Sequence, residues 1–189
     1  MRNLFVLVAL MIVGSLTTVQ AQEKNPNGYP VGGTIVSING KNPIGQKFEH
    51  DGIEFEITRL TSDDVEVKIK NNTSDMVILS FNDSYFVSGE ETEPVITDET
   101  IMMDIDKPIQ DAKIAPNTFI SKRLMNKELL SLSMPLFSNK WSNNTFKKTG
   151  QSTYKKLVVS VKKGEDKVQH SFDFKIQGSN ELKSLRTKK

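Results

Sequence analysis

Residues 53–70, IEFEITRLTSDDVEVKIK, decide the fold class of this chain. On either side of a polar turn, every second residue is apolar: Ile53, Phe55, Ile57, Val65, Val67 and Ile69. A period of two places successive side chains on opposite faces of a β-strand. The stretch therefore predicts two neighbouring strands of an antiparallel sheet that has one face on a core and one face in water.

The same alternation returns near the C-terminus, where Phe172, Phe174 and Ile176 are separated by Asp173 and Lys175. Further strands are expected at 34–38, 76–81, 85–87, 94–103, 118–124 and 156–162. Beyond residue 21 the chain holds 11 Val, 14 Ile and 12 Thr but only two Ala, a balance that favours strands over helices. Together these patterns predict an all-β, antiparallel fold of about nine or ten strands.

Short turns rich in glycine separate the predicted strands. Asn39-Gly40 predicts a type I′ hairpin turn, because both central residues of that turn need a positive φ. Asp51-Gly52 and Gly164-Glu165-Asp166 break the chain in the same way. Short strands with a turn about every 8–12 residues are typical of a β-sandwich.

The N-terminus has the order of a secretory signal peptide. Arg2 precedes an unbroken apolar run of ten residues, Leu4 to Val13, and Val19-Gln20-Ala21 offers small residues to a signal peptidase. Ten residues of helix cover about 15 Å, roughly half of a bilayer core, which favours a signal peptide over a membrane anchor. We therefore expect cleavage after Ala21 and a secreted or periplasmic protein without a membrane span.

The expected organisation has four parts. They are a signal peptide over 1–21, a flexible arm rich in Pro and Gly over 22–33, a β-sandwich domain over 34–177, and a basic tail over 178–189 that frays. The chain has no cysteine, which excludes disulfides and thiolate sites and, in an exported protein, fits a bacterial route.

Four stretches carry a resemblance to a known kind of protein. They are GIEFEITRL (52–60), DVEVKIKNNTSDMVILSFNDSYFV (64–87), KIAPNTFISKRL (113–124) and KKLVVSVKKGEDKVQHSFDFKI (155–176). Over about Gly52–Gln177 their order resembles the immunoglobulin-like β-sandwich domains of secreted bacterial proteins of unknown function. The resemblance implies an immunoglobulin-like sandwich and an exported location, and it implies no catalytic residue.

The segment 124–146 is a long connection in a chain otherwise joined by short turns. Its first part favours a short helix within 126–134, which ends before Pro135. The rest surrounds the only tryptophan, and long loops with an aromatic anchor often bind ligands. The candidate binding residues are Phe137, Lys140, Trp141 and Asn143. The alternative is that Trp141 is a core plug that closes one end of the sandwich.

Neither a metal nor a cofactor is expected. His50 and His170 lie far apart in sequence and lack the spacing of a zinc site. Asp104, Asp106 and Asp111 form a weak calcium candidate, because Asp104 and Asp106 would share one strand face with Asp111 nearby, and calcium prefers such clusters of oxygen ligands.

No catalytic motif occurs, so an enzyme is not expected. A hydrolase needs only two carboxylates, and Glu54 with Glu56 could be proposed, but alternation already explains that pair as a solvated face. With 25 basic and 23 acidic residues the chain does not resemble a nucleic-acid binder. We interpret the paired lysines at 147–148, 155–156 and 162–163 as protection of a sheet edge.

The sequence therefore predicts a non-catalytic binding module that contacts an unknown protein or glycan through loops of a β-sandwich. The first alternative is an envelope assembly component that pairs through an exposed sheet edge. The second alternative is a hydrolase that uses carboxylates.

Overall fold

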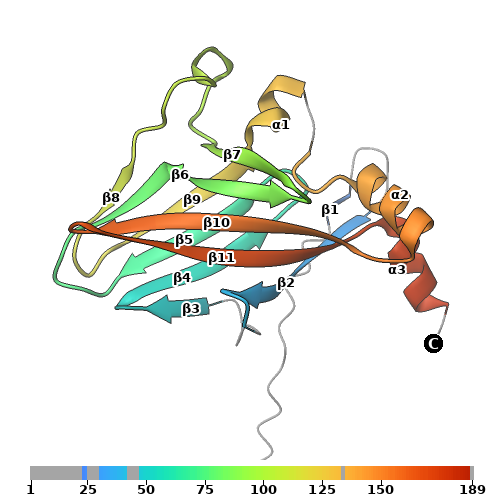
Figure 1. Ribbon diagram of the computed structural model, residues 1–189, viewed down its shortest axis with the longest axis horizontal. Coiled ribbons are helices and arrows are strands. Elements are labelled where there is room, and N and C mark those ends of the chain that lie inside the picture. The colour runs from blue at the N-terminus through green and yellow to red at the C-terminus, as the bar shows by residue number, and fades with distance from the viewer. Residues whose placement is uncertain (1–22, 25–29, 42–46, 133–134, 188–189) are drawn as a thin grey trace, which may run out of the picture.

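The computed structural model describes residues 23–24, 30–41, 47–132 and 135–187 (Figure 1). The predicted signal peptide and half of the predicted arm, residues 22 and 25–29, lie outside these residues. The all-β, antiparallel prediction is confirmed, since every strand pairing among the described residues is antiparallel. Among these residues no helix is both long enough and apolar enough to cross a membrane.

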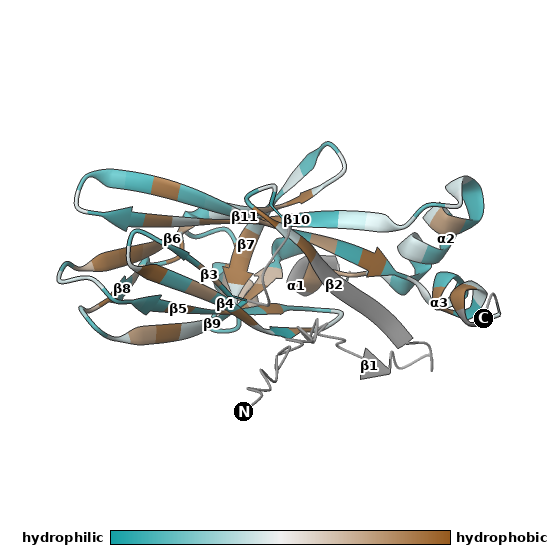
Figure 2. Cartoon of the chain, turned by 90° about the horizontal axis from the view of Figure 1, so that it is seen from below, coloured by the Kyte–Doolittle hydropathy of each residue, from teal (hydrophilic) through white to brown (hydrophobic). Residues whose placement is uncertain are grey.

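The strands form one hydrogen-bonded path that folds over into two layers (Figures 1 and 2). The first layer contains β1 (Glu23–Lys24), β2 (Pro30–Ile38), β11 (Asp166–Gln177), β10 (Thr153–Lys163) and β6 (Val77–Ser88), with β8 (Ala112–Ile114) also paired to β6. The second layer contains β9 (Phe119–Asn126), β5 (Val65–Asn71), β4 (Ile53–Leu60) and β3 (Lys47–His50).

One strand, β7 (Glu91–Thr97), belongs to both layers. Its first half pairs with β6, where Tyr85 lies opposite Pro94, and its second half pairs with β9, where Val95 lies opposite Asn126. The two layers are therefore joined along one side by β7.

The predicted core is confirmed. Each member of the alternating set is at most 4% exposed: Ile53, Phe55, Ile57, Val65, Val67, Ile69, Phe172, Phe174 and Ile176. The register brings these side chains together, since Phe55 lies opposite Ile69 and Ile57 opposite Val67 across β4 and β5. Burial of such side chains stabilises the fold by about 1.5–3 kcal/mol each. The finer prediction, an immunoglobulin-like sandwich, stays a prediction.

Several strand boundaries differ from the sequence prediction. The strand expected over 94–103 ends at Thr97, because a turn closed by Thr100 N donating to Thr97 O follows it, and a 3-10 helix, η1 (Met102–Asp104), comes next. The two strands expected at 76–81 and 85–87 are one strand, β6, which bulges between Ser80 and Tyr85 opposite β10.

The interpretation of the paired lysines as edge protection is wrong for β10. This strand lies between β11 and β6, so it has no free edge. Lys155 faces inward instead, and its Nζ donates at 3.0 Å to both carboxylate oxygens of the half-buried Glu93. Removing one partner of such a buried pair costs about 3–5 kcal/mol, so this lysine has a structural role.

Within the described part of the chain, three α-helices lie outside the strand path: α1 (Lys127–Leu132), α2 (Asn139–Thr149) and α3 (Ser179–Arg186). The short helix expected within 126–134 is confirmed by α1. Helix α2 was expected to be a loop, although its cap residues are in the sequence: Ser138 accepts from Trp141 N, and Gly150 ends the helix at a φ of 69°. Helix α3 lies where a fraying tail was expected.

Candidate functional site

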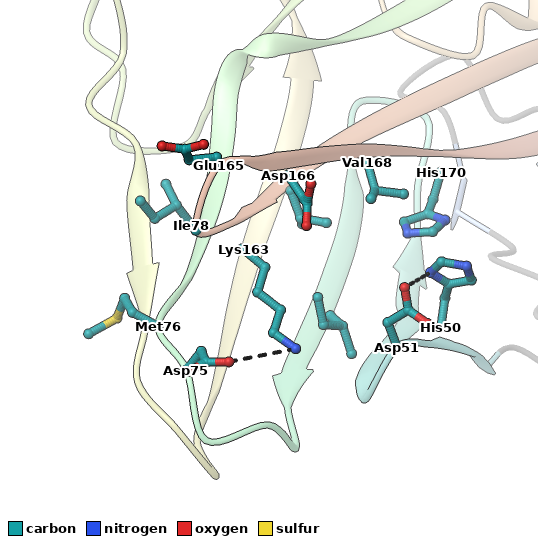
Figure 3. Close-up of a pocket in the computed structure, with 13 residues that line it drawn as sticks. His50, Asp51, Asp75, Met76, Ile78, Lys163, Glu165, Asp166, Val168 and His170 are labelled. Carbon is teal, nitrogen blue, oxygen red and sulfur yellow. Dashed lines mark ion pairs between the residues drawn. The ribbon is translucent and has the colours of Figure 1, made fainter.

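A cleft of about 900 Å³ opens at one end of the two layers, opposite the end that carries α2 and α3 (Figures 1 and 3). Three connections surround it: the β3–β4 turn, the β5–β6 turn and the β10–β11 hairpin. A volume of this size suits a small ligand or a few side chains of a peptide.

The floor of the cleft is apolar. Ile53 and Val161 belong to the buried core, and the partly exposed Val168 lies opposite Val161 on the same face. Met76 on the β5–β6 turn is 45% exposed and adds an apolar side chain at one side. An apolar floor open to water is where a ligand gains binding energy by displacing water.

Two histidines stand at the other side of the cleft, facing each other in Figure 3. Their ring centroids are 5.3 Å apart. The His170 ring also lies 5.2 Å from the Phe48 ring and 4.7 Å from the Phe55 ring. The fold thus brings together two histidines that are distant in sequence, and it packs one of them among aromatic rings.

Asn39 fixes the orientation of the His170 ring. Its carbonyl oxygen Oδ1 accepts from Ser171 N at 2.8 Å, so its amide nitrogen Nδ2 faces His170 Nδ1 at 3.1 Å. Because Nδ2 can only donate, Nδ1 accepts, and a neutral ring carries its proton on Nε2. Asn39 can serve this way because it takes a φ of 49° in the predicted Asn39-Gly40 turn, where Gly40 has a φ of 72°.

Burial sets the charge of His170. The side chain is 3% exposed, and desolvation lowers its pKa to about 4. The nearby His50 lowers the pKa further, while Asp51 acts in the opposite direction. His170 is therefore neutral at pH 7.

The rim of the cleft carries charged groups from all three connections. Asp51 Oδ2 lies 3.3 Å from His50 Nδ1, and Lys163 Nζ lies 3.7 Å from Asp75 Oδ2. Glu165 and Asp166 come from the tip of the β10–β11 hairpin. In Figure 3 Asp51 and Asp75 lie on different sides of the cleft, so they do not form a facing catalytic pair.

Hydrogen bonds hold two of the walls together. The buried Asn71 donates from Nδ2 to Asp75 O at 2.7 Å and to Ile114 O at 3.0 Å, which fixes the β5–β6 turn. Asn72 N donates to Gly52 O at 2.8 Å, which joins that turn to the β3–β4 turn. Gly52 has a φ of 76°, and a Cβ there would meet Thr73 Cγ2 at 2.8 Å, so glycine is required at this contact.

The four predicted binding residues lie at the opposite end and have separate roles. Phe137 is 1% exposed and packs on Phe174 at a centroid distance of 5.8 Å, so it belongs to the core. Asn143 joins two helices: its Nδ2 donates to Asn139 Oδ1 and Ser179 Oγ, and its Oδ1 accepts from Asn180 N.

Lys140 and Trp141 are exposed in the first turn of α2, with Trp141 at 38%. Trp141 is therefore not the core plug considered from the sequence. Leu136 and Phe137 close that end instead, and Phe137 N donates to Ser62 O at 2.8 Å. A binding role for Lys140 and Trp141 stays a prediction.

The calcium candidate is not assembled. Asp104 lies in η1 rather than on a strand and pairs with Lys107 at 2.6 Å. Asp106 pairs with Lys127, and Asp111 lies 3.8 Å from Lys162. Within the described part of the chain, no group of three or more His, Asp or Glu side chains is placed to hold a metal ion.

The hydrolase candidates Glu54 and Glu56 lie side by side on the outer face of β4. Lys47 on β3 bridges them, with Nζ 3.3 Å from Glu54 and 3.6 Å from Glu56. The pair is therefore an ion-paired strand face, as alternation had indicated. The sequence analysis missed the end cleft, although the β3–β4 and β5–β6 turns follow alternate strands and so fall at the same end of an antiparallel sheet.

No protein-family model matches this chain, and no curated protein matches it. A crystal structure of a protein from Archaeoglobus fulgidus is similar to 66% of this chain and 95% of its own, at 11% identity and a TM-score of 0.30. A TM-score of 0.30 is too low to indicate a shared fold or function.

Proposed function

We propose that this chain is a non-catalytic, exported binding module that holds its ligand in the end cleft. One observation carries the proposal: an apolar floor, open to water, lies among three connections, two of which are held together by hydrogen bonds. Loops positioned by a rigid scaffold are where β-rich domains usually bind. The exported location rests on the predicted signal peptide, and the scaffold is taken to be immunoglobulin-like, as the sequence indicates.

The cleft is favoured over the sheet edge at β3 as the site of contact. Among the described strands the path ends at β1 on one side and at β3 on the other, and β3 has four residues and exposes Lys47 and Glu49. Short, charged edge strands discourage pairing with another chain. The cleft is also favoured over the Trp141 region, because there the apolar residues Leu136 and Phe137 are already buried.

The neutral dye Nile red tests the proposal, because its fluorescence rises in an apolar site. We expect saturable binding of one dye per chain. Val168→Lys should abolish it by placing a charge over the floor. Val87→Lys is the matched control, since Val87 is also a partly exposed strand valine and lies toward the other end of β6.

The outcome is clear in both directions. Loss of dye binding in Val168→Lys with retention in Val87→Lys supports the cleft as the binding site. Equal binding by both variants, or no saturable binding by the unmodified protein, would overturn the proposal. Circular dichroism of each variant checks that it is folded.

A further inference from the structure

We propose that the cleft takes a peptide segment of a partner protein in which a lysine or arginine stands two residues from an apolar residue. This inference rests on the proposed function, because it names the ligand class of the same cleft. It is carried by the charges of the rim and by their spacing from the floor.

The rim is acidic. Four carboxylates line the cleft, from Asp51, Asp75, Glu165 and Asp166, against one lysine, Lys163, so these five groups carry a net charge of −3. Lys163 Nζ lies 3.7 Å from the Asp75 carboxylate and balances its charge. The negative charges of the other three carboxylates are not balanced by a lysine that lines the cleft. A cationic ligand is attracted to such a rim and an anionic one is repelled.

The neighbouring lysines do not cancel this charge. Lys162 and Lys167 lie opposite each other in the β10–β11 hairpin, and each is one residue away from a side chain that lines the cleft. Alternation turns them to the other face. There Lys167 lies 2.7 Å and Lys162 3.0 Å from the Asp83 carboxylate, and their hydrogen bonds hold the pKa of Asp83 well below its usual range.

Charged and apolar groups of the cleft alternate along the same strand faces. Asp166 precedes Val168 by two residues on β11, and Val161 precedes Lys163 by two on β10. Residues two apart on a strand are about 7 Å apart and point the same way. An extended peptide has the same repeat, so a cation and an apolar side chain at positions i and i+2 reach the rim and the floor together.

Three pentapeptides test the inference by calorimetric titration at low salt. Their sequences are Lys-Ser-Leu-Ser-Lys, Gln-Ser-Leu-Ser-Gln and Glu-Ser-Leu-Ser-Glu, each capped at both termini. We expect the lysine peptide to bind at least about tenfold more tightly than the glutamate peptide, with the glutamine peptide between them. Added salt should reduce the difference, because the rim charges are exposed.

A double variant locates the effect. Glu165→Gln with Asp166→Asn should weaken the lysine peptide and leave the glutamine peptide unchanged. Glu90→Gln with Glu91→Gln is the control, because it removes two adjacent exposed carboxylates from the β6–β7 turn, away from the cleft. The control should bind all three peptides as the unmodified protein does.

Failure of this inference can be told from failure of the proposed function. Equal affinity for the three peptides, with dye binding still lost in Val168→Lys, would overturn the charge preference and leave the cleft as a binding site. If the double variant Glu165→Gln with Asp166→Asn binds the lysine peptide as tightly as the unmodified protein does, the rim of the cleft is not the place where the peptide binds. A dimer in solution that dissociates in this double variant would show that a second copy, rather than a partner protein, occupies the cleft.

Discussion

At one end of the two layers the core is covered by Leu136 and Phe137, whereas at the other end it opens into the cleft beneath the β10–β11 hairpin (Figures 1 and 3). The closed end uses an insertion between β9 and β10, and the three connections that surround the cleft are short turns. Packing stability is therefore concentrated at the closed end, and accessible apolar surface is left at the open end.

Phe137→Ala should lower the free energy of unfolding by about 3–5 kcal/mol, because it removes a fully buried ring from its packing on Phe174. Val168→Ala at the open end should cost much less, since this side chain is only partly buried. Urea denaturation measures both values. Equal costs for the two variants would mean that the ends do not differ in packing.

His170 should make the open end sensitive to acid. Its pKa is about 4 in the folded state against 6.5 in the unfolded chain, so both states are neutral above pH 6.5. As the pH falls from 6.5 to 4, the unfolded chain binds a proton that the folded chain does not, and stability falls by about 3 kcal/mol in total.

Urea melts of the protein and of His170→Gln at pH 7, 5.5 and 4 isolate this effect. Gln can still accept a hydrogen bond from Asn39 but does not titrate. The difference in stability between the two proteins should shrink as the pH falls. If the difference in stability between the two proteins does not change with pH, the pKa of His170 is the same in the folded and unfolded states, and burial does not lower it.

Asn143→Ala should cost about 1–3 kcal/mol, because it leaves the partly buried hydrogen-bonding groups that link α2 to α3 without a partner. Asn144→Ala, one residue further on and exposed, should change stability by less than about 0.5 kcal/mol. Thermal melts of the two variants provide the comparison. A neutral Asn143→Ala would mean that the helix pair does not need this contact.

Trp141→Ala should have the smallest effect on stability, at most about 1 kcal/mol, because the side chain is 38% exposed on α2. As the only tryptophan, it should show red-shifted emission and strong quenching by iodide. A blue, unquenched spectrum with a large loss of stability would place Trp141 in the core and give the closed end a further packed residue.

Much of the fold follows from local patterns. The alternation at 53–57, 65–69 and 172–176 identifies nine core residues because strand side chains repeat every two residues whatever the rest of the fold does. The Asn39-Gly40 turn is predicted for a similar reason, since its backbone angles depend on those two residues alone.

The candidate site could not be predicted in this way. His50 and His170 are separated by most of the chain, and they meet because β11 in one layer packs against β3 and β4 in the other. The length of the connection at 124–146 predicts a binding site around Trp141. In the structure the helices near this residue join and cover one end of the layers.

The sequence by itself determined the strand faces, the tight turns and the all-β class, because these depend on neighbours along the chain. Only the tertiary structure decided which end of the layers is closed and which is open. That choice depends on where Leu136 and Phe137 pack against the layers, and on which turns the antiparallel order gathers at the other end. The acidic rim arises in the same way, because Asp51, Asp75, Glu165 and Asp166 come from three separate connections.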